Sequence, residues 1–116
     1  MNASLDLPSV DIETAAALAV TPTVVLLDVR EDDEWIAGHT PDAIHIPLGE
    51  LPARVDELDA TRRIVCICRS GNRSARGTRW LRDRGFDAVN MSGGMRAWAD
   101  AGHAVVDDRG RLGTVR

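Results

Sequence analysis

The sequence predicts an α/β protein with three layers, in which a central, mostly parallel sheet carries helices on both faces. Two observations lead to this prediction. Apolar, β-branched segments alternate with amphipathic segments, and the connections between them are short. In addition, residues 23–29 and 64–67 are apolar almost without interruption, which is typical of strands covered on both faces of a sheet.

The order of the elements follows from the same patterns. Strands are predicted at residues 23–29, 43–46, 64–67 and 86–91. Helices are predicted at residues 11–19, 31–37, 51–58, 75–84 and 95–101. The first of these helices combines an acidic first turn with an alanine-rich body. In the third, Leu51, Val55 and Leu58 are spaced for one face, and Gly85 suits the C-terminal cap of the fourth.

The chain has 116 residues, a length typical of a single domain. We expect one domain over residues 1–116 with a core at about 10–106. Residues 1–8 are expected to be a flexible lead-in, and the polar segment 107–116 a mostly unstructured tail. No internal repeat and no long linker divides the chain.

The composition and charge of the chain limit its expected partners and its expected cellular location. The net charge of −4 argues against nucleic acid as a main partner. No run of 18 apolar residues occurs, so no membrane association is expected. The first residues lack the basic opening and apolar run of a secretion signal, so a cytoplasmic location is expected. All 14 basic residues are arginine, which excludes a lysine Schiff base.

The chain has two cysteines, Cys66 and Cys68, and three histidines, His39, His45 and His103. A disulfide between the cysteines would be strained, because same-face strand positions project in parallel. The histidines show no metal-ligand spacing, so neither a metal nor another cofactor is expected. Cys66 is interpreted as a small buried apolar residue.

Cys68 lies where the strand at 64–67 ends and a helix is about to begin. Free backbone N–H groups and the helix dipole place partial positive charge there. Arg69 and Arg73 add two full charges, and Gly71 lets the backbone curl around the sulfur as an anion-binding nest. In such surroundings a cysteine pKa falls from about 8.5 to roughly 3.5–7.5. The loop is therefore predicted to hold a thiolate, an anionic substrate or both.

At this point the sequence resembles a family, the rhodanese (sulfurtransferase) domains. Residues 68–74, Cys-Arg-Ser-Gly-Asn-Arg-Ser, are similar to their active loop. Three further stretches match in order: Asp28-Val29-Arg30-Glu31 with Glu34, then Gly38-His39-Thr40-Pro41-Asp42-Ala43 with Ile46-Pro47, and then Gly93-Gly94-Met95 with Trp98. The resemblance covers roughly residues 10–106. Asp42 stands where the family usually has glycine, and Asp tolerates turn conformations.

The resemblance implies a rhodanese-like fold and a sulfurtransferase activity. Cys68 would attack the outer sulfur of an anionic donor such as thiosulfate, hold it as a persulfide and pass it to cyanide or a thiol. Such covalent catalysis predicts ping-pong kinetics. The N–H groups of residues 69–74 would stabilise the negative charge.

The loop residues have distinct expected roles. Arg69 should attract the anionic donor. Arg73 either braces the loop or contacts the substrate, and bracing is favoured. Ser70 and Asn72 are expected to form the turn, and Ser74 could cap the helix.

Asp28, Arg30 and His39 lie in the matching motifs outside the loop. Asp28 and Arg30 are expected to hold neighbouring loops through hydrogen bonds and an ion pair. His39 is expected to cap or brace rather than to transfer protons, because a preformed thiolate needs no general base.

Two alternatives stay open. Phosphatases and arsenate reductases related to this fold use a Cys-x5-Arg loop, whereas Cys68 and Arg73 form Cys-x4-Arg, a smaller ring that should suit sulfur better. The other alternative is a regulatory binding module or a persulfide carrier that serves a sulfur-relay partner protein.

Overall fold

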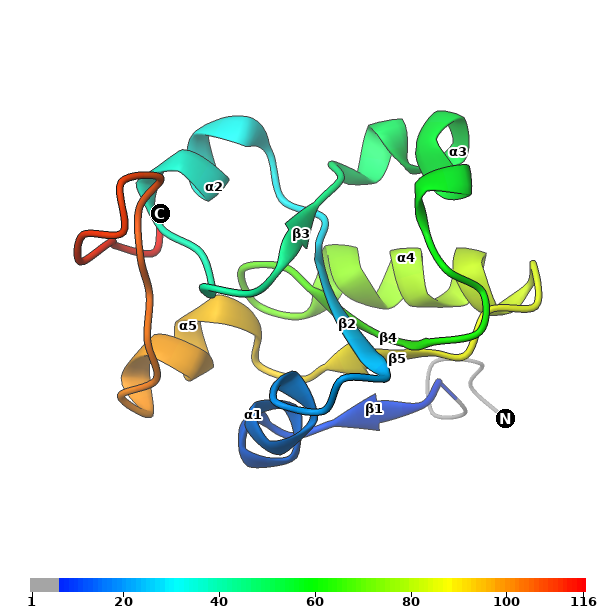
Figure 1. The fold of residues 1–116 in the computed structure, drawn as a ribbon, viewed down its shortest axis with the longest axis horizontal. Coiled ribbons are helices and arrows are strands. Elements are labelled where there is room, and N and C mark those ends of the chain that lie inside the picture. Colours follow the sequence, from blue (N-terminus) through cyan, green and yellow to red (C-terminus); the bar gives the residue numbers. More distant parts are fainter. Residues whose placement is uncertain (1–6) are drawn as a thin grey trace.

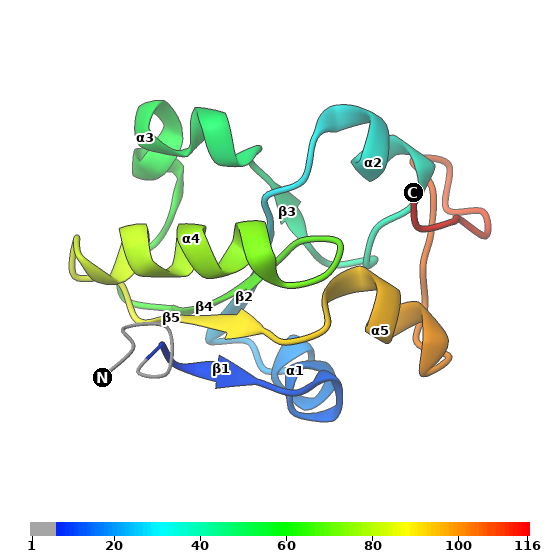
Figure 2. The same ribbon diagram turned by 180° about the vertical axis from the view of Figure 1, so that it is seen from behind.

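The computed structural model describes residues 7–116, so most of the predicted lead-in lies outside the described residues. Its sheet contains five strands: β1 (Ser9–Val10), β2 (Val24–Asp28), β3 (Ile44–His45), β4 (Arg63–Ile67) and β5 (Ala88–Met91). They lie in the order β1-β5-β4-β2-β3, and every neighbouring pair is parallel (Figures 1 and 2). The predicted parallel sheet is confirmed, with β4 at its centre.

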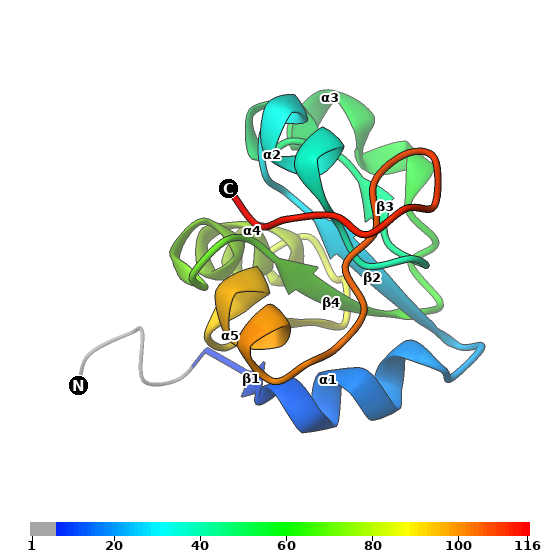
Figure 3. The ribbon, with the colours of Figure 1, turned by 90° about the vertical axis from the view of Figure 1, so that its left-hand side faces the viewer.

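Helices cover both faces of this sheet (Figure 3). On one face lie α1 (Ile12–Ala19) and α5 (Gly94–Asp100), and on the other lie α3 (Leu51–Arg54) and α4 (Asn72–Arg82). The helix α2 (Asp32–Ala37) follows the end of β2. The three-layer fold predicted from the sequence is therefore confirmed. No helix within residues 7–116 has both the length and the apolar character needed to cross a membrane.

The side chains of the central strands belong to two apolar clusters, one on each face of the sheet. Leu26 and Val65 pack towards α1 and α5, whereas Leu27 and Cys66 pack towards α3 and α4. This alternation follows from the two-residue period of a strand, and both faces are buried because helices cover both. Cys66 is fully buried, in agreement with its interpretation as a core residue.

Local capping explains where the first two helices begin. The Asp11 side chain accepts a hydrogen bond of 2.8 Å from the N–H of Thr14, which satisfies one free donor of α1. At α2, Glu31 and Glu34 form a reciprocal capping box. Both starts agree with the predicted helices to within one residue.

The segment 51–58 differs from the single helix that was predicted. It consists of α3 followed by a 3-10 turn, η3 (Val55–Glu57), and a second 3-10 turn, η2 (Leu48–Glu50), directly precedes it. Leu51 and Leu58 are buried as their spacing predicts. The apolar stripe thus specifies which side chains face the core, but it does not distinguish an α-helix from consecutive 3-10 turns.

Both ends of the described chain make contacts that the sequence pattern does not indicate. β1 pairs with β5, and two residues are too few for a periodic signal. Residues 107–116, predicted to be a mostly unstructured tail, contain no helix or strand. Nevertheless, the N–H groups of Gly113 and Thr114 donate to the carbonyls of Val105 and Ala37, each at 2.9 Å.

Candidate active site

Cys68 follows the last residue of β4, at the carboxyl edge of the sheet, and the chain then turns directly into α4 (Figure 2). Gly71 forms the N-cap of this helix with a φ of 106°, a conformation that favours glycine. The helix therefore begins at Asn72, three residues before the predicted start. Ser70 is exposed in the turn, whereas Asn72, which was predicted to form the turn, is the exposed first residue of α4.

The Cys68 sulfur is enclosed by hydrogen-bond donors, and the residue is only 1% exposed. The N–H of Gly71 lies 3.1 Å from Sγ, and Oγ of Ser74 lies 3.2 Å from it. Burial raises the pKa of the Cys68 thiol, but hydrogen bonds from the Ser74 hydroxyl and from the N–H groups of Ser74, Gly71 and Ser70 together hold this pKa below its ordinary value. The geometry thus favours a thiolate.

Ser74 does not cap the helix, contrary to the expectation from its type. It lies inside the first turn, fully buried, and its hydroxyl also lies 2.5 Å from Oδ1 of Asn90 in β5. Because Gly71 already occupies the N-cap position, the Ser74 hydroxyl lies between the Cys68 sulfur and Asn90 instead.

Arg73 forms a bidentate ion pair with Glu34 of α2. Its two terminal nitrogens lie 2.7 and 2.8 Å from the two carboxylate oxygens, and this pair joins the active loop to α2. The contact supports the bracing role. Hydrogen bonds are the largest of the causes that lower the pKa of Cys68, and the charge of Arg73, although paired with Glu34, also interacts with the sulfur.

Arg69 is exposed, and its Nε donates to the carbonyl oxygen of Arg116 at 2.9 Å. Arg116 in turn pairs with Asp33 of α2 at 3.4 Å. The position of Arg69 at the outer edge of the loop is compatible with attraction of an anionic donor.

The start of α5 holds the backbone of the loop from behind. The N–H groups of Met95 and Arg96 donate to the carbonyls of Cys68 and Arg69, at 2.8 and 3.0 Å. Gly94 makes this approach possible, because a Cβ on it would lie only 2.5 Å from the Cys68 carbonyl oxygen and its φ is 62°. With the carbonyls turned towards α5, the N–H groups that follow face the sulfur.

Asp28 and Arg30 form a fully buried ion pair of 2.7 Å beside the loop. The backbone N–H and Nε of Arg30 also donate to Asp28, and Arg30 Nη2 donates to the carbonyl of Gly38 at 2.8 Å. Together these bonds fix the Arg30 side chain at the end of β2 and join it to the segment that follows α2. This arrangement is consistent with the bracing role expected for both residues.

His39 has its ring stacked on that of Trp35, with centroids 3.6 Å apart, and its Nδ1 lies 2.8 Å from the Trp35 carbonyl oxygen. Its backbone pairs with Val106. No hydrogen bond joins it to Cys68, so its contacts are those of a bracing residue.

Three contributors to the site were not assigned a role from the sequence: Glu34, Asn90 and Gly94. Glu34 and Gly94 lie in the matched motifs, but their partners are far away in the chain. Asn90 had one sequence signal, since it is a polar residue inside the otherwise apolar strand β5.

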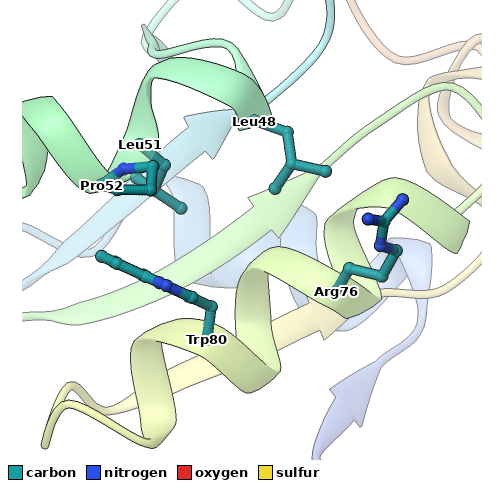
Figure 4. Close-up of a pocket in the computed structure, with 5 residues that line it drawn as sticks. All are labelled: Leu48, Leu51, Pro52, Arg76 and Trp80. Atoms are coloured by element: carbon teal, nitrogen blue, oxygen red, sulfur yellow. The ribbon is translucent and has the colours of Figure 1, made fainter.

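A separate groove lies between α3 and α4, and Figure 4 shows its five lining residues. It has a volume of about 260 Å³ and is lined by Leu48, Leu51, Pro52, Arg76 and Trp80. None of them belongs to the loop at 68–74, so the groove is distinct from the sulfur site. Within residues 7–116 no three His, Cys, Asp or Glu side chains gather to hold a metal ion.

The chain belongs to the rhodanese-like domain family, whose model matches residues 11–101. It is 42% identical over 91 residues to "Putative sulfurtransferase YtwF" of Bacillus subtilis, covering 76% of this chain and 88% of that protein. These similarities support a role in sulfur transfer.

Two further relatives are longer than this chain. The chain is 45% identical over 74 residues to "Putative sulfur carrier protein YrkF" of Bacillus subtilis, covering 63% of this chain but 40% of that protein. The crystal structure of a thiosulfate sulfurtransferase from Pseudomonas aeruginosa superposes with a TM-score of 0.79 at 30% identity, covering 98% of this chain and 23% of that one.

Proposed function

We propose that the protein transfers a sulfane sulfur from an anionic donor such as thiosulfate to cyanide or a thiol, through a persulfide on Cys68. The observation that carries this proposal is the donor arrangement at the sulfur: Gly71 N–H at 3.1 Å and Ser74 Oγ at 3.2 Å, at the start of α4. Such donors stabilise negative charge on a sulfur atom before and after transfer.

In the first half-reaction, the Cys68 thiolate attacks the outer sulfur of thiosulfate. A new S–S bond forms as the bond to the central sulfur of thiosulfate breaks, and sulfite leaves with the electron pair. In the second half-reaction, cyanide attacks the outer sulfur of the persulfide, thiocyanate leaves and the thiolate is regenerated. No proton is transferred in either step, which agrees with a site in which His39 does not contact the sulfur.

Intact-mass measurement tests the proposal. Incubation with thiosulfate should add the mass of one sulfur atom, and cyanide should remove it. The Cys68→Ser variant should take up no sulfur, whereas Cys66→Ser should still take it up. Sulfur uptake by Cys68→Ser would refute the assignment.

A carrier role is the second candidate, favoured by the similarity to YrkF. In this case a partner protein would supply or receive the persulfide sulfur, and the chemistry at Cys68 would be the same. Steady-state turnover separates the two roles: a carrier would be loaded by thiosulfate slowly, but would release its sulfur rapidly to its partner.

A phosphatase-like role is disfavoured by the ion pair of Arg73 with Glu34. In that class the loop arginine binds the oxyanion, whereas here the guanidinium is engaged by a carboxylate. The corresponding experiment measures hydrolysis of a phosphate monoester, and no hydrolysis is expected.

A further inference from the structure

A chain of buried polar groups connects the Cys68 sulfur to Asn90 of β5. Ser74 Oγ lies 3.2 Å from Sγ on one side and 2.5 Å from Asn90 Oδ1 on the other. Asn90 Nδ2 donates to the carbonyl of Gly71 at 3.1 Å. Cys68, Ser74 and Asn90 are 1%, 0% and 7% exposed. The chain is therefore shielded from solvent.

The orientation of the Asn90 amide follows from its partners. The Gly71 carbonyl can only accept a hydrogen bond, so it must face the NH₂ group of Asn90, and Oδ1 must face Ser74. Two oxygens 2.5 Å apart need a proton between them, and an amide oxygen has none to give. The Ser74 hydroxyl therefore donates to Asn90 in this arrangement.

A serine hydroxyl has a single proton, so Ser74 cannot donate to Asn90 and to the sulfur at the same time. While it donates to Asn90, it offers only lone pairs to Cys68, and these suit a protonated thiol that donates to Ser74 Oγ. When Cys68 ionises, the hydroxyl must turn towards the thiolate, and Oδ1 of Asn90 loses its donor inside the protein.

We propose that Asn90 is a positioning residue that acts through Ser74 to favour the uncharged states of the Cys68 sulfur. One such state is the free thiol. The other, which rests on the function proposed above, is the inner sulfur of the persulfide, because the negative charge then lies on the outer sulfur. Asn90 thus favours the loaded protein over the free thiolate, while the backbone N–H groups keep the thiolate available for attack.

The test is the rate of alkylation of Cys68 by iodoacetamide, measured against pH in Asn90→Leu, in Ser74→Ala and in the double variant. Asn90→Leu should lower the apparent pKa of Cys68 by up to about one unit, because the hydroxyl of Ser74 is freed for the thiolate. Ser74→Ala should raise it by about one unit. The double variant should titrate like Ser74→Ala, since the effect proposed for Asn90 on the pKa requires the Ser74 hydroxyl.

Two controls separate this role from simple support of the loop. Thr78→Val removes another buried hydroxyl of α4, one that donates to the Ser74 carbonyl, and should leave the Cys68 pKa unchanged. Asn90→Ser, which is too short to reach Ser74, should reproduce the lowered pKa if the leucine variant does not fold. A raised or unchanged Cys68 pKa in the Asn90 variants, or an equal shift in the Ser74→Ala background, would overturn the proposal.

Loading provides a second readout. In mixtures of thiosulfate and sulfite, Asn90→Leu should shift the loading equilibrium towards the free thiolate by up to about tenfold, the equivalent of one pKa unit. Unchanged loading would contradict the preference for the persulfide. The alkylation experiment uses no sulfur donor, so it remains decisive for Asn90 even if the parent protein takes up no sulfur and the proposed function fails.

Discussion

The ion pair between Arg73 and Glu34 allows a direct test of whether Arg73 braces the loop or binds the substrate. Arg73→Ala removes two charge-assisted hydrogen bonds of 2.7 and 2.8 Å. Hydrogen bonds to charged groups contribute about 1.5–3 kcal/mol, but the Arg73 side chain is 34% exposed and water screens part of this energy. We therefore expect a loss of about 1–2 kcal/mol, or roughly 4–8 °C in Tm for a domain of this size.

The pH dependence of stability provides an independent check on the same pair. A hydrogen bond from the Arg73 side chain outweighs partial burial and lowers the pKa of Glu34 below its usual value of 4.5. A carboxyl whose pKa is lowered by folding stabilises the protein above that usual value and loses its contribution as pH falls through the folded-state pKa. Thermal melts between pH 7 and pH 3 should therefore show a shallower acid-induced loss of stability in Arg73→Ala than in the parent.

Kinetics complete the test. The variant should lose kcat for thiosulfate along with its stability, because a loosened loop no longer directs its N–H groups at the sulfur. Arg76→Ala is the matched control: it removes an exposed arginine one turn further along α4, and among the described residues no salt bridge involves Arg76. If Arg73→Ala melts like the parent and only its KM rises, Arg73 faces the substrate and the bracing role is wrong.

Three more results are expected. Alkylation should modify Cys68 at neutral pH but not Cys66, because burial raises the pKa of Cys66 to about 12; equal labelling of both thiols would contradict this. Arg69→Ala should mainly raise KM for thiosulfate, and the effect should shrink as salt increases, since exposed charges are screened over about 8 Å at physiological ionic strength; a salt-independent effect would exclude long-range attraction. Arg30→Leu should cost about 3–5 kcal/mol in chemical denaturation, because it leaves the Asp28 carboxylate buried without its partner, and a loss below 1 kcal/mol would count against this.

Local sequence was sufficient to predict the layers and the position of Cys68 between the central strand and a helix. The segments that form β2 and β4 are apolar almost without interruption, which is typical of strands buried on both faces. Such strands indicate a parallel sheet with helices on either side. Cys68 comes directly after such a strand and is followed by glycine and a helix. Its surroundings can be predicted from the local sequence, because the N–H donors to the sulfur come from the next few residues. The prediction of a depressed Cys68 pKa depended only on these neighbours in the chain.

The contacts that shape the site were decided by the tertiary structure. Glu34 reaches Arg73, and Asn90 reaches Ser74, only because β2, β4 and β5 end at the same edge of the sheet and place α2 and α4 against one another. Serine is common at helix caps, but Gly71 with its positive φ occupies the cap of α4, so the Ser74 hydroxyl lies inside the first turn between the sulfur and Asn90. Hydrogen bonds and ion pairs between distant segments depend on where whole elements pack, and that information is absent from any short stretch of sequence.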